Sequence, residues 1–323
     1  DLVQSLVGCN DTEALYILAD WFEIPIDETD NLVVQKNKRQ VNDSDNASLL
    51  HSIHENRELN MILESLGYDV GNNPLLTACH KYLGLGVSPE VLPDKYERLA
   101  GAMLFPIRDG EGVLQGFLKY KAEEKGKECI CYPPNLADSC LLGLYQAIKA
   151  IEKLGFVYLV WNYNDLLTMH IAGFTNTVAC YNGSLTSQQI DLLLKYTNRV
   201  VLIHTSEVSK QVRATKTAAR LSFASAVPYC LSLSKKNIPT LYKWMGAAKF
   251  EYFIRQSTRL VFLNALKDKW LIEQQTLSKR SNDAKSKEEK IELRSKLVVL
   301  RNKLDKLFTI LDENCDYLCR YFE

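Results

Sequence analysis

Short apolar runs alternate with amphipathic segments between residues 156 and 204, and this alternation limits the possible folds more than any other feature of the chain. The apolar runs FVYLVW, TVACY and RVVLIH have the length and composition of buried strands. Apolar residues between them recur at helical spacing. Strands and helices alternating in this way predict a small parallel sheet with crossover helices. The strands are expected at 156–161, 177–181 and 199–204, and the helices at 164–173 and 187–197.

The segments on either side of this core have different patterns. Upstream, AMLFPI (102–107) and VLQGFLKY (113–120) flank the turn signal RDGEG, which predicts a β-hairpin. An amphipathic helix follows over 141–155 and is expected to end at Gly155. Beyond Pro239 the chain is predicted to be entirely helical. The expected fold class is therefore α/β plus α, with a mixed α+β part before the parallel sheet and a helical region after it.

The two ends of the chain are expected to be helical as well. Residues 11–24 and 49–67 have amphipathic periodicity, and the polar stretch 27–48 between them indicates a linker. Near the other end, 280–290 is a charge-rich break. Seven leucines then form a stripe, which predicts a helix that packs either within an antiparallel hairpin against the helix at 250–275 or against a partner protein. We call these residues the leucine stripe: Leu293, Leu297, Leu300, Leu304, Leu307, Leu311 and Leu318.

Composition excludes several classes of protein. Lys plus Arg and Asp plus Glu both total 39, so any argument for nucleic-acid binding has to come from local charge. No apolar run approaches the roughly 20 residues that span a bilayer, so no membrane role is expected. The chain starts at Asp1 without the plan of a signal peptide. We therefore expect a piece of a longer protein that works in the cytoplasm, at the nucleoid, or in an organelle matrix of bacterial origin.

The nine cysteines suit a reducing compartment, because their number is odd, their spacing is irregular and none forms a CxxC pair. A zinc site from Cys79 with His80, or from the close pairs Cys129/Cys131 and Cys315/Cys319, is one interpretation. Buried free thiols are the interpretation we favour.

Five segments, in order along the chain, resemble the catalytic core of bacterial DnaG-type DNA primases. Residues 1–26 resemble the tail of that family's CHC2-type zinc-binding domain. FPIRDGEGVLQGF (105–117) resembles its FPIRD hairpin, and GLYQAIKAI (143–151) resembles the helix that leads into its TOPRIM fold. VWNYND (160–165) and the segment that continues to 204 resemble the TOPRIM core, which begins VEGYMD. The last of the five, 238–254, resembles the DPD segment.

The resemblance implies a division of the chain into five parts. A zinc-domain tail (1–26) and a polar linker (27–48) precede a primase-core N-terminal subdomain (49–152). A TOPRIM-like subdomain (153–236) and a helical C-terminal region (237–323) follow. Any zinc would be bound by the upstream part of the family's zinc domain.

In this family the TOPRIM site holds divalent metals through carboxylates, since hard cations prefer oxygen ligands. The resemblance carries the family's glutamate onto Trp161, its following glycine onto Asn162, and the aspartate that ends the first motif onto Asp165. Of the acids implied, only Asp165 and Glu207 are acidic in this chain. The remaining metal-linked positions of the family fall on Thr205, Glu207, Ile238 and Thr240.

Trp161 is the decisive departure, because a tryptophan cannot bind a metal and its bulk would fill the space of a cation. Asp165 and Glu207 would hold Mg²⁺ weakly at best, so no resident metal or other cofactor is expected. Asp165 has the alternative role of a helix N-terminal residue favoured by the helix dipole. Glu207 has the alternative of a solvated side chain paired with Lys210 at i,i+3.

A basic segment follows the altered site. From Val208 to Phe250 there is no acidic residue, and eight residues are basic. Four of them recur at helical spacing and are predicted to form one face, which either binds a phosphate backbone or is an ordinary solvated surface. The hairpin that resembles the family's basic ridge adds three more cations, and Tyr120 and Tyr132 either stack on bases or pack internally. The predicted nucleic-acid-binding residues are Arg108, Lys119, Lys121, Lys210, Arg213, Lys216, Arg220, Lys235 and Lys236.

Three hypotheses follow for function. The first is an active DNA primase, a nucleotidyltransferase, with a non-standard metal site. The second is a catalytically degraded primase relative, a pseudoenzyme that binds single-stranded DNA or RNA and replication proteins. The third is a structural subunit that reuses the fold. The lost carboxylates and the basic segment favour the second hypothesis. By position alone, the C-terminal helices suggest docking to a replicative helicase or another replication protein.

Overall fold

The computed structural model describes residues 82–319 apart from 93, 121–128, 181–183 and 234. The predictions for 1–26, 27–48 and 49–67, the Cys79–His80 pair and Lys121 lie outside the described residues. The chain divides into two compact units, one that ends at Trp244 and one that contains Met245 onwards. The five predicted domain boundaries stay predictions.

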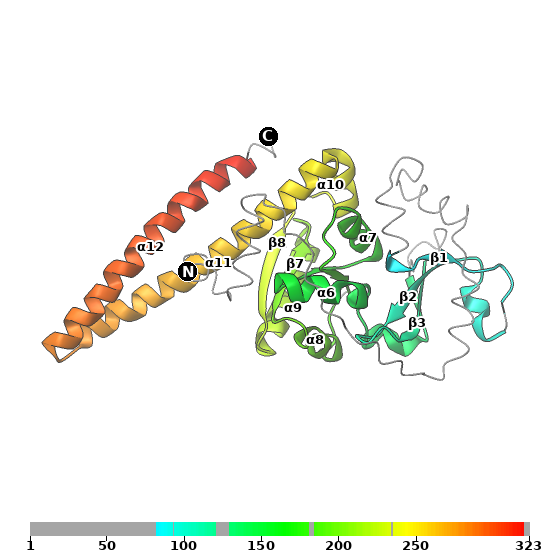
Figure 1. Cartoon of the computed structure of the whole chain (residues 1–323), viewed down its shortest axis with the longest axis horizontal. Coiled ribbons are helices and arrows are strands. Elements are labelled where there is room, and N and C mark those ends of the chain that lie inside the picture. The colour runs from blue at the N-terminus through cyan, green and yellow to red at the C-terminus, as the bar shows by residue number, and fades with distance from the viewer. Residues whose placement is uncertain (1–81, 93, 121–128, 181–183, 234, 320–323) are drawn as a thin grey trace, which may run out of the picture. The chain divides into compact units, whose positions relative to one another are not determined.

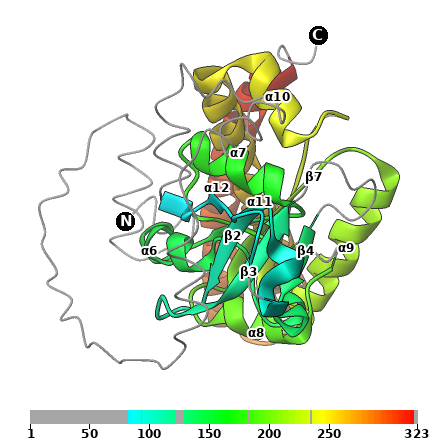
Figure 2. The same ribbon diagram turned by 90° about the vertical axis from the view of Figure 1, so that its right-hand side faces the viewer.

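The predicted β-hairpin is confirmed and belongs to a four-stranded antiparallel sheet, ordered β1-β2-β3-β4 (Figure 2). Met103 of β2 pairs with Tyr120 of β3, and a bulge between Ile107 and Arg108 shifts the register beside the turn. Phe117 and Leu104 are buried in its core with Leu99 and Tyr96. The strands are β1 (Gly86–Val87), β2 (Met103–Arg108), β3 (Leu114–Tyr120) and β4 (Cys129–Tyr132), with 3-10 helices at Asp94–Leu99 and Pro134–Asp138.

The predicted parallel sheet is also confirmed, with the strand order β6-β5-β7-β8 and all neighbouring strands parallel (Figure 1). Its strands are β5 (Val157–Val160), β6 (Thr177–Ala179), β7 (Arg199–His204) and β8 (Val227–Ser232). The helices of this unit are α6 (Leu144–Leu154), α7 (Tyr163–Ile171), α8 (Ser187–Leu194), α9 (Val208–Phe223) and α10 (Ile238–Met245). Helix α6 ends as predicted at Gly155, whose φ of 69° is the left-handed conformation that glycine adopts without strain.

One hydrophobic core joins the parallel sheet to three of its helices. Apolar side chains of α6, α8 and α9 pack with inward-facing residues of β5, β6 and β7, and Trp161 belongs to the same core. Helix α8 begins with the capping box of Thr186 and Gln189. The Gln189 side chain also donates to the carbonyl oxygens of Ala137 and Cys140, at 3.0 and 2.8 Å, and so links the segment after β4 to the parallel sheet.

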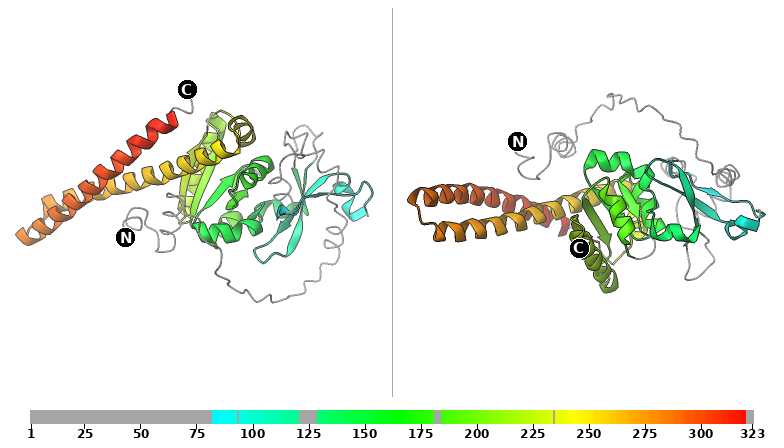
Figure 3. Two further views of the ribbon diagram at one scale, coloured as in Figure 1. Left: turned by 45° about the horizontal axis from the view of Figure 1, so that its top comes forward. Right: turned by 90° about the horizontal axis from the view of Figure 1, so that it is seen from below.

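Two long helices, α11 (Ala247–Asp283) and α12 (Lys287–Cys319), form the second unit. They run antiparallel and side by side in Figures 1 and 3, which confirms the predicted hairpin. The described part of the leucine stripe, Leu293 to Leu311, is buried. Its members from Leu300 to Leu311 pack in one cluster with α11 residues that include Leu263 and Trp270. The predicted break at 280–290 is wrong in extent, because α11 continues to Asp283 and α12 starts at Lys287. Both helices continue into the charged residues because these lie on solvated faces.

The described cysteines only partly follow the prediction of buried thiols. Cys131, Cys140 and Cys180 are free and buried, as predicted, whereas Cys230 is free and exposed on β8. No group of three or more His, Cys, Asp or Glu side chains that could hold a metal occurs among the described residues. None of the described helices is both long and apolar enough to cross a membrane.

Candidate functional site at the carboxyl edge of the parallel sheet

The strand order creates a switch point between β5 and β7. The chain leaves β5 for β6 on one side of the sheet and returns to β7 and β8 on the other. In open parallel sheets, ligands bind in the crevice outside the carboxyl ends of the two strands that flank such a point. Trp161 directly follows β5 and Thr205 directly follows β7. Two of the positions singled out in the sequence therefore lie at this edge.

Trp161 fills the crevice at the switch point. Its side chain is buried, and the indole Nε1 donates a hydrogen bond to the carbonyl oxygen of Ile203 on β7 at 2.8 Å. The Arg213 guanidinium lies over the ring, with Cζ 5.7 Å from the ring centroid. A cation at this distance from an indole face is attracted to it. Trp161 is therefore bonded to the neighbouring strand and covered by a protein cation.

Asp165 lies in the first turn of α7, next to this edge. Asn162 caps the helix by accepting from the Asp165 backbone amide at 2.8 Å, and its Nδ2 donates to Asp165 Oδ2 at 2.7 Å. The other carboxylate oxygen, Oδ1, makes no hydrogen bond of standard geometry among the described residues. Burial raises the pKa of Asp165 to about 6, although Asn162, Lys210 and the backbone amide of Ile238 all favour the charged form.

The three uncharged replacements offer almost nothing to a cation. Thr205 is buried, and its hydroxyl oxygen has no hydrogen-bond partner among the described residues. Ile238 is buried at the start of α10 and carries no ligand atom. Thr240 is exposed, and its amide donates to Asn237 Oδ1 at 3.0 Å, which caps the helix. The hydroxyls of Thr205 and Thr240 are therefore the only oxygens that these three side chains offer, and neither carries a charge.

Glu207 is exposed at the N-cap of α9 and is already paired. It accepts from the Ser209 hydroxyl at 2.7 Å and pairs with Lys210 at 3.5 Å, as predicted for a solvated side chain. The Ser209 hydrogen bond and the charge of Lys210 lower the pKa of Glu207. The acids that remain therefore do not fit the divalent metals that the family resemblance implies. Asp165 is buried and has one oxygen without a standard hydrogen bond among the described residues. Glu207 is exposed and is engaged by Ser209 and Lys210 of its own helix. Trp161 fills the space beside them.

The basic residues predicted on α9 share one side of the helix. Ala214, Thr217 and Leu221 form the buried side. Lys216 and Arg220 are exposed, and no ion pair is recorded for either in the described part of the chain. Lys210 and Arg213, by contrast, contact Glu207 and Trp161. We call Lys210, Arg213, Lys216 and Arg220 the α9 basic face.

The basic residues predicted near the hairpin are less accessible. Lys119 on β3 is only 9% exposed. Arg108 is half-buried, and its Nη1 donates to the Gly112 carbonyl oxygen at 2.8 Å, so it closes the β2–β3 turn. Tyr132 packs edge-on against Tyr96, with 5.5 Å between ring centroids, which is the internal packing considered as an alternative. The side chain of Tyr120 lies outside the described residues.

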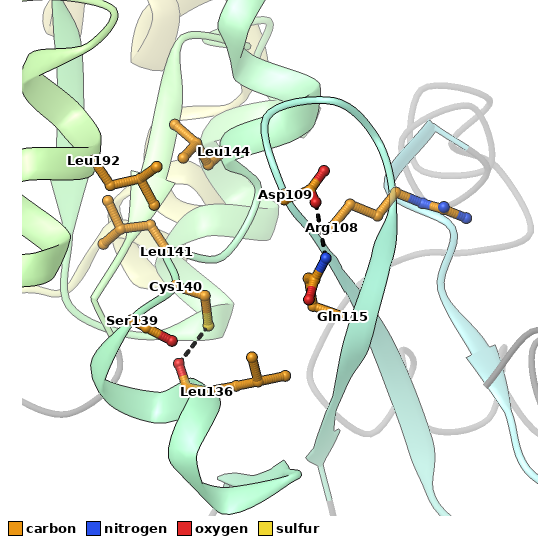
Figure 4. A pocket seen from close by; sticks show the side chains of 9 residues that line it. All are labelled: Arg108, Asp109, Gln115, Leu136, Ser139, Cys140, Leu141, Leu144 and Leu192. Atoms are coloured by element: carbon orange, nitrogen blue, oxygen red, sulfur yellow. Dashed lines mark hydrogen bonds between the residues drawn. The ribbon is translucent and has the colours of Figure 1, made fainter. Parts of the chain in front are cut away.

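A pocket of about 290 Å³ lies between the β2–β3 turn and the parallel-sheet part of the unit (Figure 4). Leucines of the 136–144 segment and Leu192 form one wall, and Arg108, Asp109 and Gln115 form the other. Asp109 accepts from the amides of Glu111 and Val113 and from the Gln115 side chain. These polar groups are therefore used to shape the turn. In the opposite wall, the Cys140 thiol donates to the Leu136 carbonyl oxygen at 2.8 Å.

Sequence reasoning missed one prominent residue, Trp244 on α10. Its side chain is 58% exposed, and the Lys236 ammonium lies 3.9 Å from its ring centroid. The signal available in the sequence was a tryptophan close to Lys235, Lys236 and Lys243 in a segment without acids. Lys235 and Lys236, both predicted as nucleic-acid-binding residues, are exposed beside it.

Comparison with known proteins gives a consistent result, although no protein-family model matches the chain. The DNA primase of Aquifex aeolicus is 31% identical over 141 residues, which cover 42% of this chain and 26% of that primase. The DNA primase of Buchnera aphidicola is 24% identical over 183 residues, covering 54% and 32%. That of Haemophilus influenzae is 28% identical over 180 residues, covering 51% and 29%. The matches span between a quarter and a third of these relatives.

Solved structures share the fold. The RNA polymerase domain of Mycobacterium tuberculosis primase DnaG superimposes with a TM-score of 0.54 at 15% identity, covering 78% of this chain and 94% of that one. A DnaG primase catalytic domain bound to single-stranded DNA gives 0.53 at 16% identity, with the same coverage. The zinc-binding and RNA polymerase domains of Aquifex aeolicus primase give 0.52 at 19% identity, covering 92% and 80%. Sequence and fold together relate this chain to the DnaG-type bacterial DNA primases.

Proposed function

We propose that this chain is a primase-family protein of DNA replication that has lost metal-dependent nucleotidyl transfer and acts by binding nucleic acid. The observation that carries the proposal is Trp161. On a TOPRIM-like core, this position would hold the glutamate that binds metal, and here a buried indole bonded to Ile203 occupies it. Transfer of a nucleotide needs divalent cations to neutralise the developing charge. The remaining acids, Asp165 and Glu207, do not compensate for this loss.

The α9 basic face supports binding without a metal. Lys216 and Arg220 present two accessible charges, and the whole segment 208–250 lacks acids that would repel phosphate. Structures with this fold have been solved with single-stranded DNA and with double-stranded DNA, in the second case with the Mycobacterium tuberculosis domain. We infer that single-stranded DNA or RNA is the ligand of this chain.

An active primase with a non-standard site is the second candidate. The observation in its favour is Asp165 Oδ1, which makes no hydrogen bond of standard geometry among the described residues, because such an oxygen suits a cation. We rank it below the first because Glu207 is engaged by Ser209 and Lys210.

Docking of a replicative helicase or another replication protein through the C-terminal helices is part of the proposal by position only. The leucines of the stripe from Leu300 to Leu311 pack inside the α11–α12 hairpin. A partner would therefore have to contact the outer faces of these two helices.

The binding proposal is tested by reversing charge on α9. The variant Lys216→Glu/Arg220→Glu leaves Lys210 and Arg213 in their contacts, so it removes exposed charge with little structural cost. We expect its affinity for a fluorescent single-stranded oligonucleotide to fall at least about tenfold. The slope of log affinity against log salt concentration should become shallower by about two. The reason is that each phosphate that is no longer contacted keeps its counterion.

The matched control is Lys279→Glu/Arg280→Glu on α11, which reverses the same number of exposed charges. Its affinity should stay within about twofold of the wild type. Unchanged binding in the α9 variant would favour the structural-subunit hypothesis instead.

A further inference from the structure

Trp244 is one of the large apolar side chains that the described part of the chain leaves exposed. Helix α10 buries Ile238 and Leu241, and Trp244 lies off that side with 58% of its side chain exposed. Tryptophan is buried in most proteins because its large ring is costly to hydrate. A tryptophan ring exposed to this degree is typical of a surface that binds a flat ligand.

The surroundings of the ring are cationic. The Lys236 ammonium lies 3.9 Å from the ring centroid, and Lys235 and Lys243 are exposed on the same short segment. No acidic residue occurs between 208 and 250. An apolar protein partner covering Trp244 would also have to desolvate these ammonium groups, whereas a polyanion would pair with them.

Helix α10 also lies next to the candidate site within the same unit. Asp165 interacts both with the backbone amide of Ile238, where α10 begins, and with Lys210 of the α9 basic face. The two basic elements therefore approach one another at this carboxylate. The chain from α9 to α10 carries no acid of its own. Of the two acids beside it, Asp165 is buried and Glu207 is paired with Lys210.

We propose that Trp244 and Lys236 form a base-stacking subsite for single-stranded nucleic acid. An unpaired base stacks on the face of the Trp244 ring that Lys236 does not cover, and the Lys236 ammonium pairs with an adjacent phosphate. Stacking of this kind accepts any base, since every base has a flat π-face. Duplex does not use the subsite, because its bases are already stacked on each other. This inference rests on the proposed nucleic-acid binding. It adds that the bound nucleic acid is single-stranded and that Trp244 contacts its bases.

The experiment measures fluorescence anisotropy with three probes of equal length: single-stranded oligo-dT, an abasic strand with the same phosphates, and a duplex. Trp244→Ala should bind oligo-dT about tenfold more weakly than the wild type. Its binding to the abasic strand and to the duplex should be unchanged. Trp244→Phe should retain most of the oligo-dT affinity because it keeps an aromatic face.

The matched control is Phe223→Ala, which removes another aromatic side chain from the acid-free segment. Phe223 is 92% exposed, and no cation is recorded over its ring in the described residues. This variant should bind all three probes like the wild type. Oligo-dT should also quench tryptophan emission in the wild type and not in Trp244→Phe, which provides a readout that does not depend on affinity.

Two outcomes would overturn the subsite. One is a Trp244→Ala variant that binds oligo-dT as tightly as the wild type, and the other is an equal loss in Phe223→Ala. In both cases the wild type still binds, so the proposed function survives. Failure of the wild type to bind any of the three probes is a different result, and it would remove the proposed function together with the subsite.

Discussion

The type of residue that directly follows β5 decides whether this position of the carboxyl edge can present an oxygen ligand. A glutamate there would project an oxygen ligand into the crevice, whereas Trp161 closes the crevice and bonds to Ile203. The sequence alone was enough to find the substitution, and its effect on metal binding stays a prediction. The bond to Ile203 and the contact with Arg213 join residues far apart in the chain, so they required the fold.

Asp165 gives a test at the scale of one residue. Burial raises its pKa from 3.8 to about 6, so the native state binds a proton more tightly than the unfolded chain. Above pH 6 the Asp165 side chain is charged in the native state. Its burial then lowers the free energy of unfolding by roughly 3 kcal/mol at most. Asp165→Asn removes the charge and can keep the bond from the Asn162 amide.

We therefore expect Asp165→Asn to increase the free energy of unfolding at pH 8 by about 1–3 kcal/mol. The gain should shrink as the pH falls through 6 and vanish below 3.8, where wild-type Asp165 is protonated in both states. Denaturant titrations at several pH values measure it. A loss of stability at pH 8 would mean that the carboxylate is held by a favourable partner, such as a bound cation.

At the scale of elements, the long helices depend on packing between α11 and α12 more than on helix propensity. Leu307 is fully buried in this interface, whereas Val298 on the same helix is 56% exposed. Leu307→Ala should lower the stability of the hairpin by roughly 2–5 kcal/mol. Val298→Ala should change it by less than about 0.5 kcal/mol. Circular dichroism during thermal unfolding distinguishes the two, and equal effects would contradict the packing described here.

Elements with a strong pattern of apolar and turn residues were predictable from the sequence, and elements with a weak pattern were not. The β2–β3 hairpin, α6 with its Gly155 cap, and the strands β5, β6 and β7 all follow from apolar runs bounded by turn residues. Strand β8 was missed because it is an edge strand in which only Leu231 is buried, so its residues show no clean alternation. Trp244 was missed because its exposure depends on how α10 packs.

For the molecule as a whole, net charge is a poor guide to function. The chain carries 39 basic and 39 acidic residues, yet most of its acid-free segment falls on α9, β8 and α10, and the segment ends in the first residues of α11. Long-range attraction of a phosphate backbone depends on such local excess, because charges beyond roughly 10 Å are screened at physiological salt. The neutral total is therefore compatible with binding by one surface.

The central claim is that this primase-type core has no metal clamp at its carboxyl edge. Titration of the chain with Mn²⁺, followed by the electron paramagnetic resonance of the free ion, tests it directly. A DnaG-type primase core that keeps its acidic residues provides the positive control. We predict no saturable binding below about millimolar Mn²⁺, and no difference between the wild type and Asp165→Ala. A stoichiometric Mn²⁺ site that disappears in Asp165→Ala would contradict the account and restore the active primase as the better interpretation.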